Sequence, residues 1–97
     1  MIVRIVQMTF QKEKVTHFIS FFESRKHLIR NFAGCNHLEL WQDTNEDNIF
    51  FTYSIWDNEY ALNKYRFSEF FKDTWTITKA MFVAKPQAWS VNRKIVV

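Results

Sequence analysis

The sequence predicts an α+β fold in which four strands form one antiparallel sheet and helices cover one of its faces. Segments rich in β-branched and aromatic residues alternate with two longer segments of helical periodicity, and a polar turn separates two of the strands. The 97 residues contain one glycine and one proline, which argues against a disordered or turn-dense all-β chain. The length predicts a single domain over residues 1–97.

The first part of the chain is expected to form a strand, a helix and a second strand. Ile2 to Phe10 is mostly β-branched and apolar, which is typical of a strand. Apolar residues recur at helical spacing between about Glu13 and Arg30, and Gly34 stands where the end of a helix is expected. His37 to Gln42 has the pattern of the second strand.

The remaining strands complete the sheet. Residues 43–48 are polar and predict a turn, so Ile49 to Trp56 should form a hairpin with the strand before it. Pro86 ends the second helical region, and Gln87 to Asn92 is expected to be the fourth strand. The order β-α-β-β-α-β is that of the ferredoxin-like fold, with both helical regions on one face of the sheet.

Two helices are expected between the third and fourth strands. Asp57 can cap a short helix that begins at Asn58. Ser68 can cap a longer helix that ends near Phe82.

Both faces of the predicted sheet are apolar, which predicts a partner for one of them. Side chains alternate across a strand, and both sets in Ile2–Phe10 and in Ile49–Trp56 contain large apolar residues. Helices cover one face only, so we expect a homodimer that packs sheet against sheet. Met8 and Phe50 are assigned to the face that meets the second copy, and an aspartate at either position should break the dimer. A monomer with exposed apolar surface is the alternative.

Charge and cysteine content limit the remaining partners. The formal net charge of +3 is spread among acidic residues, so no nucleic-acid partner is expected. No apolar run is long enough for a membrane span, and the N-terminus lacks the pattern of a signal peptide. Cys35 is the only cysteine, which excludes an internal disulfide and is typical of a cytoplasmic protein.

The chain resembles the antibiotic biosynthesis monooxygenase (ABM) superfamily of dimeric α+β barrel proteins. The most distinctive segment is Tyr65 to Phe71, followed by Trp75 to Lys79 and Lys85 to Ser90. Further matching segments are Ile2–Val6, Phe32–Cys35 and Phe50–Leu62. The resemblance covers nearly the whole chain and implies the fold more specifically than the activity.

The resemblance implies two functions. One is a monooxygenase that uses dioxygen without metal or flavin and acts on a small aromatic or quinol-like molecule, whose own anion reduces dioxygen. The alternative is a non-catalytic dimeric module of the same fold that binds a small ligand or a partner. In the first, the protein supplies an apolar cavity between helices and sheet and polar groups that hold the deprotonated oxygen.

Candidate site residues follow from the same resemblance. Tyr65 is expected to donate its phenolic proton to an oxyanion, and the residues Phe22, Tyr53, Phe71 and Trp75 are expected to line the substrate pocket. Gln7 is the one long polar side chain on its strand face and could orient a substrate oxygen if that face meets the helices. Ordinary packing is the alternative for the aromatic residues, and a buried amide satisfied by backbone or water is the alternative for Gln7.

The sequence departs from the haem-degrading and metal-binding patterns. Trp75 stands where the haem-degrading branch places its axial histidine, and Tyr65 and Phe70 stand where many relatives carry histidines, so no haem is expected. Cys35, His37 and Glu39 could share a strand face as metal ligands. Gly34 favours a loop at Cys35, and no fourth ligand is evident, so no metal or other cofactor is expected.

Overall fold

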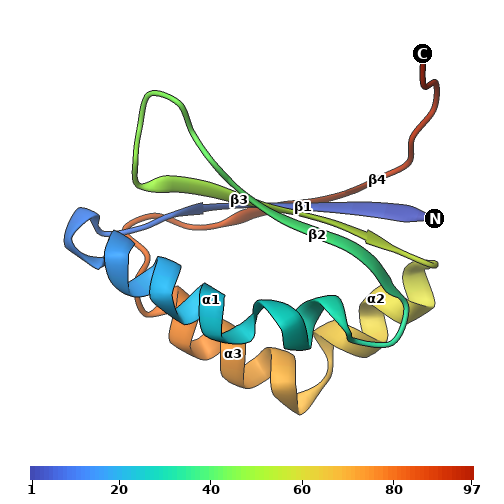
Figure 1. The fold of residues 1–97 in the computed structure, drawn as a ribbon, viewed down its shortest axis with the longest axis horizontal. Helices are drawn as coiled ribbons and strands as arrows, with labels where there is room; N and C mark the ends of the chain where they lie inside the picture. Colours follow the sequence, from blue (N-terminus) through green and yellow to red (C-terminus); the bar gives the residue numbers. More distant parts are fainter.

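The computed structural model describes all 97 residues, and helices cover one face of a four-stranded antiparallel sheet (Figure 1). The strands are β1 (Ile2–Thr9), β2 (Cys35–Gln42), β3 (Ile49–Trp56) and β4 (Gln87–Val91), in the spatial order β2-β3-β1-β4. The helical elements are the 3-10 turn η1 (Lys12–Lys14), α1 (Val15–Arg30), α2 (Glu59–Arg66) and α3 (Glu69–Lys79). The predicted ferredoxin-like α+β fold is confirmed.

The caps of α2 and α3 show why these helices begin where they do. The cap of α2 is Asn58, whose Oδ1 accepts a hydrogen bond from the Ala61 amide at 2.9 Å. The prediction of Asp57 as this cap is wrong, because its carboxylate accepts a hydrogen bond from Asn36 Nδ2 at 2.7 Å instead. Ser68 caps α3 as predicted, since its Oγ accepts from the Phe71 amide at 3.1 Å.

Two further boundaries differ from the prediction. α3 ends at Lys79 rather than near Phe82, because Phe82 lies opposite Phe10 in an isolated antiparallel β-bridge. β2 begins at Cys35, which pairs with Trp56, and a β-bulge separates Cys35 from His37. The expectation of a loop at Cys35 is therefore wrong.

The core lies between the helices and the sheet. Met8 of β1, Phe50 of β3 and Phe10, which directly follows β1, cluster with Phe18 of α1. The Phe10 and Phe18 ring centroids are 4.0 Å apart. Met8 is 3% exposed and Phe50 is 2% exposed. The assignment of Met8 and Phe50 to the face that meets a second copy is wrong, because this face packs against the chain's own helices.

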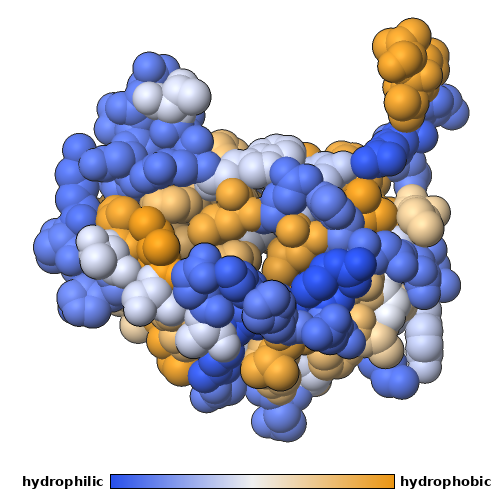
Figure 2. All heavy atoms as spheres, in the orientation of Figure 1, coloured by the Kyte–Doolittle hydropathy of each residue, from blue (hydrophilic) through white to orange (hydrophobic).

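The other face of the sheet, the open face, carries no helix (Figure 1). The strand registers place on it the residues Val3, Ile5, Gln7, His37, Glu39, Trp41, Phe51, Tyr53, Ile55, Trp89 and Val91. Trp41 is 39% exposed and Trp89 is 43% exposed. The β2–β3 turn and the C-terminal tail rise on this side, and the tail ends in apolar residues (Figures 1 and 2).

None of the helices combines the length and the apolar character that a transmembrane span requires.

Candidate functional site

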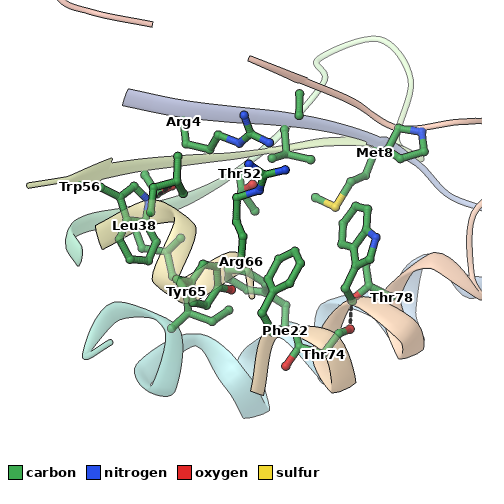
Figure 3. A pocket seen from close by; sticks show the side chains of 18 of the residues that line it. Arg4, Met8, Phe22, Leu38, Thr52, Trp56, Tyr65, Arg66, Thr74 and Thr78 are labelled. Atoms are coloured by element: carbon green, nitrogen blue, oxygen red, sulfur yellow. Dashed lines mark hydrogen bonds between the residues drawn. The ribbon is translucent and has the colours of Figure 1, made fainter. Parts of the chain in front are cut away.

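A cavity of about 280 Å³ lies between the helix-facing side of the sheet and the helices (Figure 3). Most of its wall is apolar, with residues from all three α-helices and from all four strands. Four of the residues predicted for the site lie on this wall: Phe22, Tyr65, Phe71 and Trp75. The fold therefore brings together the part of the predicted pocket that comes from the helices.

Phe71 and Trp75 form one aromatic side of the cavity. They are four residues apart on α3 and so share a helix face, and their rings stack with centroids 5.8 Å apart and an interplanar angle of 12°. The edge of Trp75 also meets Phe82, with ring centroids 5.5 Å apart. This pair offers an apolar wall against which a flat ring can pack.

Tyr65 is held rigidly in the wall by other rings. It is 8% exposed, stacks on Trp56 with centroids 4.9 Å apart, and meets Phe71 edge-on at 5.0 Å. Tyr65 lines the cavity, and its hydroxyl forms no hydrogen bond within the chain. Because no fully buried polar side-chain atom of the protein lacks a hydrogen-bond partner, this hydroxyl is not fully buried. Burial, and to a lesser extent the nearby Cys35, raises the pKa of Tyr65 well above its usual value. The Tyr65 hydroxyl therefore keeps its proton and acts as a hydrogen-bond donor, not as a base.

Two arginines meet in the cavity from opposite sides (Figure 3). Arg4 extends from β1 and Arg66 from the end of α2, with the guanidinium groups directed toward each other. Arg4 Nη1 donates to Ser90 Oγ at 2.9 Å, and Arg66 Nη1 donates to Asn63 Oδ1 at 3.4 Å. Neither arginine takes part in any of the protein's ion pairs. Burial, and then the positive charge of Arg66, lowers the pKa of Arg4.

The other polar groups of the wall are mostly occupied. Ser54 Oγ accepts a hydrogen bond from Trp56 Nε1 at 3.0 Å, and Thr78 Oγ1 donates to the Thr74 carbonyl at 2.8 Å. No histidine, carboxylate, lysine or cysteine lines the cavity. The cavity can hold a flat apolar molecule, donate one hydrogen bond to it from the Tyr65 hydroxyl and attract negative charge through the two arginines. It contains none of the side chains that usually act as a general base.

Gln7 and Tyr53 lie outside the cavity, on the open face. Gln7 pairs with Phe51 in the register of β1 and β3, on the side opposite Met8. Tyr53 stacks on Trp41 with centroids 4.8 Å apart, and its hydroxyl accepts from Arg93 Nη2 at 2.7 Å. The expectation that Gln7 and Tyr53 contribute to the pocket is wrong, because their strand face points away from the helices.

Cys35, His37 and Glu39 do not converge. The Cys35 side chain lies in the core beside Trp56, and its Sγ donates to the His37 carbonyl at 3.6 Å. His37 and Glu39 lie on the open face, where they form a hydrogen-bonded pair, and Glu39 also accepts from Trp41 Nε1 at 2.8 Å. Because the bulge places Cys35 on the opposite side of the sheet, the three side chains cannot hold one metal ion together.

The sequence model of a family described as antibiotic biosynthesis monooxygenase matches residues 1–75. The chain belongs to this family. The match extends from β1 to Trp75 in α3, so it contains Arg4, Tyr65 and Arg66 as well as the aromatic wall. The resemblance inferred from the sequence is confirmed.

Solved structures agree with this membership at the level of the fold. A crystal structure of an antibiotic biosynthesis monooxygenase superposes with a TM-score of 0.90 at 16% identity, over 98% of this chain and 100% of that one. A conserved protein from Methanosarcina mazei Go1 superposes with a TM-score of 0.88 at 19% identity, over 96% of this chain and 93% of that one. Rv0793 from Mycobacterium tuberculosis superposes with a TM-score of 0.87 at 9% identity, over 98% of this chain and 96% of that one. The search of curated proteins gave no match.

Proposed function

We propose that this ABM-family protein binds a small flat aromatic molecule in the cavity and oxidises it with dioxygen, without a metal or flavin. The observation that carries the proposal is the aromatic cavity of about 280 Å³ with Tyr65 in its wall, whose hydroxyl has no partner within the chain. A dry cavity of about 150 Å³ holds benzene, so this volume suits a molecule of about two fused rings. The family membership supplies the reaction class.

The reaction we propose draws its electrons from the substrate. A bound phenol loses its proton to water, and the ring anion transfers one electron to dioxygen. The two radicals combine into a carbon-bound peroxide anion, which takes the proton back from water to form a hydroperoxide. The hydroperoxide then loses water to leave a quinone carbonyl. For 1-naphthol the balance is one dioxygen consumed, one oxygen atom kept in the quinone and one released as water.

Tyr65 has a defined part in this sequence. Its hydroxyl stays protonated because burial raises its pKa, so it can donate a hydrogen bond to the substrate oxygen. A donor favours the ionised form of the phenol and therefore the form that reduces dioxygen. The surrounding rings hold the donor in place before the substrate arrives, which is the condition for effective electrostatic stabilisation.

A non-catalytic ligand-binding protein is the second candidate. One observation favours it: the cavity wall contains no histidine, carboxylate, lysine or cysteine that could take the proton of a substrate. This candidate predicts that aromatic molecules bind in the same cavity without being oxidised.

Oxygen consumption distinguishes the two candidates. With a panel of naphthols and anthrols we expect protein-dependent oxygen uptake, and one ¹⁸O atom from labelled dioxygen in each quinone product. Tyr65→Phe should lower the rate about a hundredfold, the usual effect of removing one donor to an oxyanion. Tyr60→Phe, on the exposed side of α2, is the matched control and should leave the rate unchanged. Binding without oxygen uptake would support the second candidate, and neither binding nor uptake across the panel would contradict both.

We also propose that the protein is a homodimer formed through the open face. The side chains of Trp41, Trp89 and Phe51 leave an apolar surface there that no element of the chain covers. Surfaces of this kind usually mark an interface, and two-fold homodimers are the commonest arrangement.

A further inference from the structure

We propose that the ligand of the cavity carries a carboxylate that Arg4 and Arg66 hold between them, so that its class is an aromatic carboxylic acid. The inference rests on the proposed binding of an aromatic molecule in this cavity, and it adds the charged group that selects the ligand.

Neither of the two arginines has a negatively charged partner within the chain. Arg4 is only half-exposed, and its one hydrogen-bond partner is the neutral Ser90 hydroxyl. Arg66 has only the neutral Asn63 amide. By contrast Arg25, which is mostly buried between α1 and α3, is paired with Asp73 at 3.0 Å. Placing two cations together without a counter-ion costs free energy, and an anion bound between them would remove that cost.

The donor geometry favours a carboxylate. Each guanidinium carries five N–H donors in a planar fork that matches the two oxygens of a carboxylate. Arg4 uses one nitrogen for Ser90 and Arg66 one for Asn63, which leaves donors of both groups free to face the cavity. No lysine contributes to the wall, and the rest of it is mostly apolar. The site therefore suits one planar anionic group attached to an apolar body.

The position of the arginines fits a ligand of this shape. Their guanidinium groups end near the sheet, whereas Phe22, Thr74 and Thr78 lie on the helix side (Figure 3). A carboxylate at the arginines would place the attached rings toward Phe22, Phe71 and Trp75. The lowered pKa of Arg4, caused by burial and by Arg66, agrees with a site that is electrostatically incomplete without an anion.

Calorimetric titration with 2-naphthoate and with its neutral isostere 2-naphthamide tests the inference. We expect the wild-type protein to bind 2-naphthoate at least about tenfold more tightly, the effect of one charge-assisted hydrogen-bond pair. Arg4→Gln and Arg66→Gln should each reduce this preference most of the way to unity while the affinity for 2-naphthamide changes little. Lys64→Gln is the matched control, since Lys64 is an exposed cation on α2 outside the cavity wall, and it should keep the preference.

The possible outcomes separate this inference from the proposed function. Equal affinity of the wild type for the two compounds would overturn the carboxylate site and leave the aromatic cavity intact. A preference for 2-naphthoate that survives both arginine substitutions would also overturn it, because the anion would then be bound elsewhere. Binding of neither compound would contradict the proposed aromatic site itself. Arg66 is exposed at the end of α2, so Arg66→Gln decides the question even if Arg4→Gln does not fold.

Discussion

Gly34→Ala is expected to lower the free energy of unfolding by about 3 kcal/mol, the sum of backbone strain and overpacking. Gly34 is the only residue with a positive φ, +88°, and it joins α1 to β2. A methyl group there would overlap the Cβ of Ala61 on α2. The Gly34 carbonyl also accepts a hydrogen bond from the Asp57 amide at 2.9 Å, so a shift at this position would disturb the start of α2.

The two contributions can be measured separately by urea unfolding. Ala61→Gly removes the methyl group that a new side chain would meet, so Gly34→Ala should cost less in that background than in the wild type. About 1 kcal/mol should remain there, because the positive φ is unfavourable for alanine whatever the space around it. Equal stability of Gly34→Ala and the wild type would contradict the conformation described for this turn.

Phe51→Asp and Phe50→Asp are expected to fail in different ways, although the residues are neighbours on β3. Phe51 lies on the open face, opposite Gln7 and Trp41 in the strand register. A charge there should dissociate the proposed dimer into folded monomers, because an unpaired charge at an apolar interface is costly. Phe50 packs against Phe10 and Phe18, so its replacement by aspartate should cost more than about 4 kcal/mol and prevent folding.

Analytical ultracentrifugation and circular dichroism distinguish the two results. The wild type should sediment as a dimer, Phe51→Asp as a monomer with an unchanged far-UV spectrum, and Phe50→Asp should show the spectrum of an unfolded chain. A folded, dimeric Phe51→Asp would count against the open face as the interface. A folded Phe50→Asp would contradict the assignment of the two sheet faces.

The element order was predictable because local chemistry determines it. Gly34 ends the connection after α1, the polar residues 43–48 form the turn of the hairpin, and Ser68 caps α3 as the sequence indicates. The cap of α2 was misassigned by one residue, because Asp57 and Asn58 are both good caps and a contact with Asn36 decides between them. Such a contact comes from another part of the chain and has no local signal.

The orientation of the sheet was not predictable in the same way. Alternation shows which residues share a strand face, but Met8 and Gln7 lie on faces that are both largely apolar, so the pattern does not show which face meets the helices. The errors at Gln7, Tyr53, Met8 and Phe50 have this one cause. The packing of Phe10 on Phe18 of α1 shows which face meets the helices. This contact joins segments that are separate in the sequence, so strand alternation alone does not predict it.

The two arginines were missed for a related reason. Arg4 is the one charged residue in a strand of otherwise neutral residues, and this signal was available in the sequence. Its importance depends on Arg66, which the fold brings to the same cavity from a distant helix. Tyr65, Phe71 and Trp75 were selected through the family resemblance, and the fold places them in one wall.

A crystal structure of the protein with 6-bromo-2-naphthoate tests the central claim, that the cavity between helices and sheet is a binding site for an aromatic acid. We predict an anomalous bromine peak inside the cavity and a carboxylate between Arg4 and Arg66. Bromine on the open face instead, or an unoccupied cavity at a saturating concentration of the compound, would contradict the claim.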